Sequence, residues 1–75
     1  MKEGNITFNS ETGRYEIDGC ALTCGTCLEI WNGEKWLSCR VEYNDNWDRG
    51  YYLMVFKGDV CTGTIPIRDK VKGRM

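Results

Sequence analysis

The chain has 75 residues, of which 41% are hydrophobic and 28% charged, with a formal net charge of −1 at pH 7. This length fits a single domain over residues 1–75 and leaves no room for a second one. The plentiful aromatic residues and the low net charge exclude an intrinsically disordered chain. The balanced charge also lacks the basic excess that is typical of proteins that bind nucleic-acid phosphates.

Apolar side chains alternate with a period of two along the chain, and no segment shows a helical period. In chain order the alternation covers Ile6 and Phe8, Tyr15 and Ile17, Leu28 and Ile30, Leu37 to Tyr43, Tyr51 to Val55, and Ile65 and Ile67. Gly, Asn or Asp lies in nearly every gap, which is typical of turns between strands. The sequence therefore predicts an all-β fold of short antiparallel strands.

The hairpin around Asn32 and Gly33 allows two registers. A two-residue loop pairs Trp31 with Glu34, whereas a four-residue loop pairs Trp31 with Trp36. We favour the four-residue loop because it pairs apolar with apolar side chains. The faces are the same in both registers. The inner face receives Leu28, Ile30, Leu37, Cys39 and Val41, and the outer face Cys27, Glu29, Trp31, Trp36, Ser38 and Arg40.

A sheet of this size with no helix to cover it must curl on itself. We therefore expect a small, partly open, five- to six-stranded antiparallel barrel, ordered over about residues 5–68. Pro66 cannot donate a ladder hydrogen bond, so its segment is expected to be a short strand, an edge strand or a 3₁₀ turn. The charged residues 69–75 are expected to form a loose tail.

The order of these motifs resembles an uncharacterised family of small bacterial domains that is common on mobile genetic elements. The matching stretches are GRYEI at 13–17, LTCG at 22–25, WLSCRVE at 36–42, GYYL at 50–53 and GTIPIR at 63–68. The resemblance implies an SH3-like barrel. It implies no catalytic residue, because the family has no assigned activity.

The cysteines allow one metal-site hypothesis. Cys20, Cys24 and Cys27 have C-x3-C-x2-C spacing, and Cys61 or Cys39 would complete a tetrahedral zinc site. The chain has a single C-x2-C pair and no histidine, so we expect no metal or cofactor and keep zinc as the alternative. A disulfide, Cys20 with Cys24 or Cys24 with Cys61, would require an oxidising compartment. Otherwise the thiols pack in the core or in turns.

Catalysis and membrane association are not expected. The lack of histidine removes the Ser-His and Cys-His arrangements of nucleophilic catalysis. The start MKEGNITF has no apolar core typical of a signal peptide. No apolar run approaches the roughly 20 residues that span a bilayer. The lack of histidine predicts that the protein is not an enzyme. The other two features, together with the odd number of cysteines, predict a cytoplasmic protein.

Large aromatic residues away from the inner face suggest a binding surface, since exposed aromatics and arginines are enriched in binding hot spots. The candidate binding residues are Trp31, Trp36, Trp47, Tyr52, Arg40 and Arg49. We predict a non-catalytic protein-interaction module, and the resemblance suggests an accessory or host-defence-inhibiting protein of a mobile element. The alternatives are a nucleic-acid-binding small barrel that stacks bases on these rings and a zinc-stabilised structural domain held by Cys20, Cys24, Cys27 and Cys61.

Overall fold

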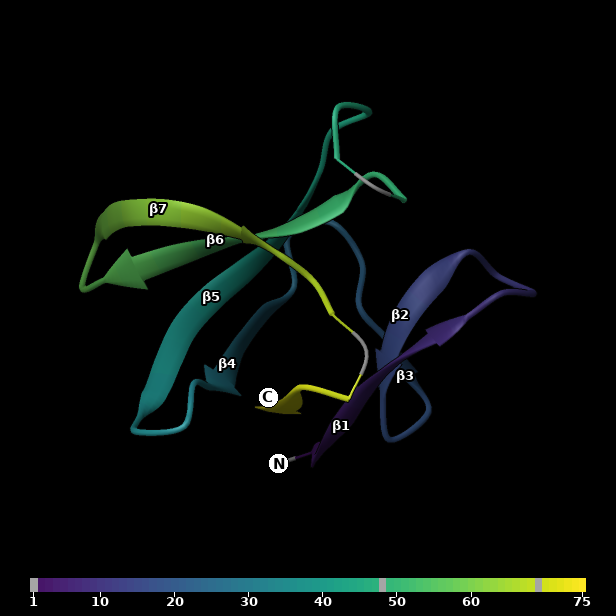
Figure 1. Ribbon diagram of the computed structural model, residues 1–75, viewed down its shortest axis with the longest axis horizontal. Coiled ribbons are helices and arrows are strands. Elements are labelled where there is room, and N and C mark those ends of the chain that lie inside the picture. Colours follow the sequence, from purple (N-terminus) through teal and green to yellow (C-terminus); the bar gives the residue numbers. More distant parts are fainter. Residues whose placement is uncertain (1, 48, 69) are drawn as a thin grey trace.

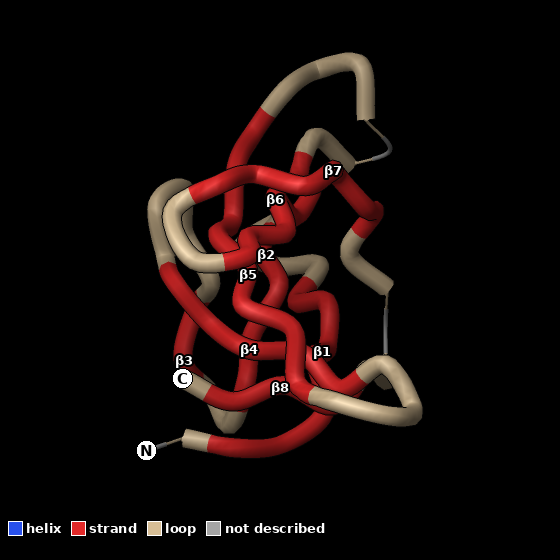
Figure 2. The backbone as a smooth tube through the Cα atoms, turned by 90° about the vertical axis from the view of Figure 1, so that its left-hand side faces the viewer, coloured by secondary structure: helices blue, strands red, loops and turns tan. Residues whose placement is uncertain are grey.

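The computed structural model describes residues 2–47, 49–68 and 70–75, so Met1, Asp48 and Asp69 lie outside the described residues. The described residues form eight strands and no helix (Figure 2). The strands are β1 (Glu3–Asn9), β2 (Arg14–Ile17), β3 (Cys20–Ala21), β4 (Cys27–Trp31), β5 (Trp36–Tyr43), β6 (Tyr51–Lys57), β7 (Val60–Pro66) and β8 (Lys72–Arg74). The all-β prediction is confirmed. No helix able to cross a membrane occurs among the described residues.

The strands form one antiparallel sheet in the order β3-β2-β1-β8-β4-β5-β6-β7. In Figure 1, β5, β6 and β7 lie on one side of the molecule, β1, β2 and β3 on the other, and β4 and β8 between them. The sheet is not closed, because β3 and β7 remain its two edges, so a barrel is not confirmed. The described strands number eight instead of five or six. Pro66 ends the edge strand β7, in agreement with the expectation of an edge position.

One core forms where the inner faces of the strands meet. Its fully buried side chains are Ile6, Ile17, Leu22, Val41 and Leu53. Alternation produces this core, because every second side chain of a strand points to the same face. Each such aliphatic side chain contributes roughly 1.5–3 kcal/mol to folding when its surface leaves water. The predicted inner face of the β4–β5 hairpin belongs to this core, with Cys39 buried and Leu37 packed against it.

The β4–β5 hairpin has the predicted four-residue loop. Trp31 pairs with Trp36, and Leu28 pairs with Cys39. The Asn32 side chain explains this choice, because its Oδ1 accepts hydrogen bonds from the backbone N–H of Glu34 at 2.8 Å and of Lys35 at 2.9 Å. Gly33 adopts a φ of 99°, which glycine reaches without steric cost. The loop therefore fixes the register that places both tryptophans on the outer face.

The expected loose tail is wrong for the described residues 70–75; Asp69 lies outside them. Residues Lys72–Arg74 form β8, which pairs with β1 on one side and β4 on the other. The main chain of Met75 also exchanges two hydrogen bonds with that of Lys2, at 2.8 and 2.9 Å. Gly73 is buried against the core, and a Cβ there would lie 2.9 Å from Cδ1 of Ile17. The C-terminal segment therefore joins the two halves of the sheet (Figure 1).

Candidate functional site

The outer face of β8, β4, β5 and β6 carries polar and aromatic side chains in aligned rows. The strand registers place Arg74 beside Glu29, Glu29 beside Ser38, and Ser38 beside Phe56. A neighbouring row pairs Cys27 with Arg40, and Arg40 with Met54. Paired residues of an antiparallel sheet point to the same face. These side chains therefore form one continuous surface opposite the core.

A pocket of about 580 Å³ lies on this surface. We call it the outer-face pocket. It is lined by Cys27, Leu28 and Glu29 of β4, by Ser38, Cys39 and Arg40 of β5, by Phe56, Gly58 and Asp59 around the β6–β7 turn, and by Arg74 and Met75. Its volume falls within the roughly 300–1,000 Å³ of small-ligand sites. It is therefore large enough to receive one or two side chains of a partner.

The two arginines of the outer-face pocket are already paired with carboxylates. Arg74 donates from Nε to Oε1 of Glu29 at 2.9 Å, and both side chains are about one-third exposed. Arg40 donates from Nε to Glu42 on the same strand, and its guanidinium carbon lies 5.2 Å from the ring centroid of Phe56. These contacts hold both cations in place, because a charge-assisted hydrogen bond restricts the guanidinium orientation.

Trp31 and Trp36 form an aromatic rim next to this pocket. Their ring centroids are 5.5 Å apart at an interplanar angle of 61°, and Trp31 is 40% exposed. The Arg74 guanidinium carbon lies 4.0 Å from the Trp36 ring centroid. Arg74 thus contacts both the rim and Glu29 in the pocket. The rim and the pocket therefore form one surface.

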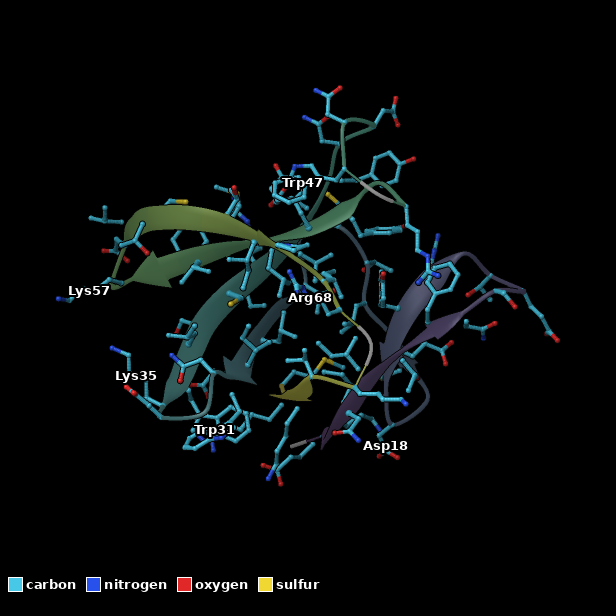
Figure 3. All side chains as sticks on the ribbon, in the orientation of Figure 1. Asp18, Trp31, Lys35, Trp47, Lys57 and Arg68 are labelled. Atoms are coloured by element: carbon cyan, nitrogen blue, oxygen red, sulfur yellow. The ribbon has the colours of Figure 1, made fainter. Side chains whose placement is uncertain are left out.

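The predicted candidates Trp47 and Tyr52 form a separate group. Their rings are stacked at a centroid distance of 4.9 Å and an interplanar angle of 12°. At the same end of β5 and β6, Tyr43 and Tyr51 pack edge to face, and a hydrogen bond with Asp45 raises the pKa of Tyr43. Figure 3 shows Trp47 in the upper part of the molecule and Trp31 in its lower part. Seven strand steps, or about 23 Å, separate the two ends of β5.

The two predicted arginines also separate. Arg40 lines the outer-face pocket, between the two aromatic groups. Arg49 instead reaches the β1–β2 hairpin, with its guanidinium carbon 4.0 Å from the Phe8 ring centroid and its Nη1 3.3 Å from Oη of Tyr15. The six candidate residues therefore do not form one patch. Arg40 lines the pocket, and the Trp31–Trp36 rim meets it through Arg74, whereas the other three candidates lie elsewhere.

The alternative zinc site is not assembled. The described residues contain no group of three or more His, Cys, Asp or Glu side chains placed to hold a metal ion. Cys20 lies on β3 and Cys61 on β7, the two edge strands of the sheet. All five cysteines are free thiols, and Cys24, Cys27 and Cys61 are exposed. Burial raises the pKa of Cys39 from 9.0 to about 11.

Comparison with known proteins identifies the family. A family model described as "Domain of unknown function (DUF5348)" matches residues 4–66. The chain belongs to the DUF5348 family. It is also similar to a protein from Ruminococcus gnavus whose crystal structure was determined by the Northeast Structural Genomics Consortium, with 27% sequence identity and a TM-score of 0.70. That match covers 99% of this chain and 100% of the other. No curated protein matches the chain at a significant level.

The DUF5348 match bears on both the resemblance and the pocket. It confirms the expectation of an uncharacterised small domain family. The matched range ends at Pro66 and includes the β4, β5 and β6–β7 residues of the outer-face pocket. Arg74 and Met75 line the pocket from β8 and its end, beyond the matched range. The pocket therefore combines family-matched strands with the C-terminal segment.

Sequence reasoning missed four residues of the pocket that carry charge or an aromatic ring: Glu29, Phe56, Asp59 and Arg74. The alternation of β4 places Glu29 on the outer face, but this position alone does not indicate a functional role. Asp59 sits in a short turn with no pattern around it. Arg74 lies in a charged C-terminal segment without alternation, so nothing in the sequence indicates its contact with Trp36.

Proposed function

We propose that this DUF5348 chain is a non-catalytic protein-interaction module whose outer-face pocket and Trp31–Trp36 rim receive a segment of a partner protein. The observation that supports this most is the continuity of the two features through Arg74. A partly exposed aromatic pair beside a pocket is the arrangement in which one partner segment gains both hot-spot contacts and an anchoring cavity.

The charges of the site favour a polypeptide over a nucleic acid. The pocket is lined by two arginines and two carboxylates, Glu29 and Asp59, and Glu42 adds a third carboxylate beside Arg40. A phosphate backbone needs uncompensated cations, which release counterions when it binds. One face of the Trp36 ring also has the Arg74 guanidinium 4.0 Å from its centroid, so that face is covered and does not offer a base a stacking platform.

Two finer features belong to the same proposal. The curl of the eight-stranded sheet around one core supports an SH3-like small barrel that stays open between β3 and β7. The resemblance to small domains that are common on mobile genetic elements suggests an accessory or host-defence-inhibiting protein of such an element. The identity of the partner tests this role, because such a protein would bind either a host defence protein or a product of the element.

The test compares matched aromatic variants in affinity capture from a lysate of the source cells. Trp31→Ala removes a rim residue that is 40% exposed, and Tyr43→Ala removes a ring at the far end of β5 that is 54% exposed. A partner that binds the site is enriched by the wild type and by Tyr43→Ala, and is lost with Trp31→Ala. Hot-spot truncation costs at least about 2 kcal/mol, or roughly 30-fold in affinity.

Two controls define the outcome. Far-UV circular dichroism must show that both variants keep the wild-type strand signal, since both residues lie at the surface. A partner retained by Trp31→Ala, or lost equally with Tyr43→Ala, would contradict binding at the outer-face pocket.

A further inference from the structure

We infer that the outer-face pocket takes a lysine or arginine side chain of the partner segment, with the cation at Asp59 and the methylene stem against Phe56. This inference rests on the proposed function and specifies the chemistry of the segment that binds. Three features of the pocket carry it: the pairing of its charges, the character of its apolar wall, and the position of Asp59 in a short turn.

The uncompensated charge of the pocket is negative. Glu29 pairs with Arg74, and Glu42 pairs with Arg40. Asp59 forms no hydrogen bond or ion pair with any described residue, including Lys57 two positions before it. An acidic segment would meet guanidinium groups that are already neutralised, whereas a basic one finds a free carboxylate. Charge complementarity therefore selects a cation.

Apolar side chains line the same pocket as that carboxylate. Phe56 is half-buried, and Met75 and Cys27 line the same pocket. Lysine and arginine extend their methylene stems along such surface while the charged group stays in water. The Phe56 ring already has the Arg40 guanidinium 5.2 Å from its centroid, which shows that this ring lies where a cation is tolerated. A long basic side chain can pack its methylene groups against this apolar wall and pair its charge with the Asp59 carboxylate.

The β6–β7 turn fixes where Asp59 lies. Lys57 pairs with Val60, so Gly58 and Asp59 form a two-residue turn, and Gly58 has a φ of 62°. Such a short turn leaves the backbone few alternatives. The backbone that carries Asp59 is therefore fixed beside the pocket before a partner arrives, which reduces the entropy lost on binding.

The test uses peptide display followed by affinity measurement. A library of random linear peptides is selected on the wild-type chain, and the bound peptides are synthesised and measured by fluorescence anisotropy. We expect the selected peptides to share a lysine or arginine. Asp59→Asn should weaken them about two- to fivefold, the fold-change of an exposed ion pair. The charge-matched control Glu11→Gln, in the β1–β2 turn, should leave the affinity unchanged.

The outcomes separate this inference from the proposed function. If the peptides lack a shared basic residue, or if Asp59→Asn binds them as well as the wild type does, the inference that the pocket takes a basic side chain is wrong. Loss of binding with Trp31→Ala would in that case still support the site. Peptides whose binding is unaffected by both Asp59→Asn and Trp31→Ala would overturn the inference and the proposed function together.

Discussion

Replacing Arg74 by alanine tests whether β8 and the outer face act as one unit. The change removes the ion pair to Glu29, whose two side chains are 29% and 38% exposed, and the contact with Trp36 at 4.0 Å. A partly exposed ion pair is worth about 0.2–1 kcal/mol, and an exposed cation–π contact about 0.5–1 kcal/mol. The free energy of unfolding should therefore fall by about 1–2 kcal/mol. In a domain of this size each kcal/mol corresponds to about 4–8 °C in Tm.

Urea unfolding followed by far-UV circular dichroism measures this loss. Arg14→Ala is the matched control, because Arg14 is exposed on β2 and makes no ion pair or ring contact with the described residues. Its free energy of unfolding should change by less than about 0.5 kcal/mol. Part of the Arg74 effect should disappear at high salt, which screens exposed ion pairs. Equal stability of Arg74→Ala and Arg14→Ala would refute a stabilising role for the contacts of Arg74 with Glu29 and Trp36.

Three further predictions concern the core and the cysteines. Gly73→Val should destabilise the chain by about 1–3 kcal/mol, because a Cβ there already lies 2.9 Å from Cδ1 of buried Ile17. A Cβ at Gly4, in the paired position of β1, meets no atom within 4 Å, so Gly4→Val should be neutral or stabilising in the same urea assay. Burial in the folded state raises the pKa of the Cys39 thiol from 9.0 to about 11. As the pH rises, the unfolded chain therefore loses this proton before the folded chain does. The stability that the neutral thiol gives below pH 9.0 should decline as the pH rises to about 11. Cys39→Val should remove that part of the pH dependence, and an identical pH profile for both chains would show that the thiol does not contribute. In native protein at pH 8, Cys24, Cys27 and Cys61 should react with a thiol reagent faster than Cys39.

The sequence was sufficient for the parts of the fold that depend on local patterns. The period of two identified the inner face that carries Leu28, Cys39 and Val41, all of which are buried. Pairing apolar side chains selected the four-residue loop, and the Asn32 side chain enforces it. The missing N–H of Pro66 indicated an edge, where β7 lies. Each of these inferences needed only residues close together in the chain.

The parts that failed depend on contacts between distant residues. β8 has only three residues, and buried Gly73 lies between two charged ones, so no alternation marks it as a strand. Its place follows from pairing with β1 and β4, and Arg74 meets Glu29 across 45 residues. Arg49 lies between Trp47 and Tyr52 in sequence, yet it contacts Tyr15, 34 residues away.

The candidate site shows the same division. Trp31, Trp36 and Arg40 were found because alternation assigns a face. The pocket beside them was not found, because it requires the β6–β7 turn and β8 to lie beside β4 and β5. Asp59 is an ordinary turn residue until that arrangement is known. In this chain, alternation in the sequence therefore predicts the faces of the strands but not the pocket formed by segments that are distant in sequence.

The most direct measurement is a two-dimensional ¹⁵N–¹H NMR titration of the labelled chain with the captured partner or a selected peptide. Binding at the outer-face pocket should shift the amide signals of residues 27–31, 36–40, 56–59 and 72–75 most strongly, because these segments form the pocket and its rim. Signals from residues 43–52 should change little. Shifts concentrated in 43–52, with the pocket segments unchanged, would contradict binding at this site.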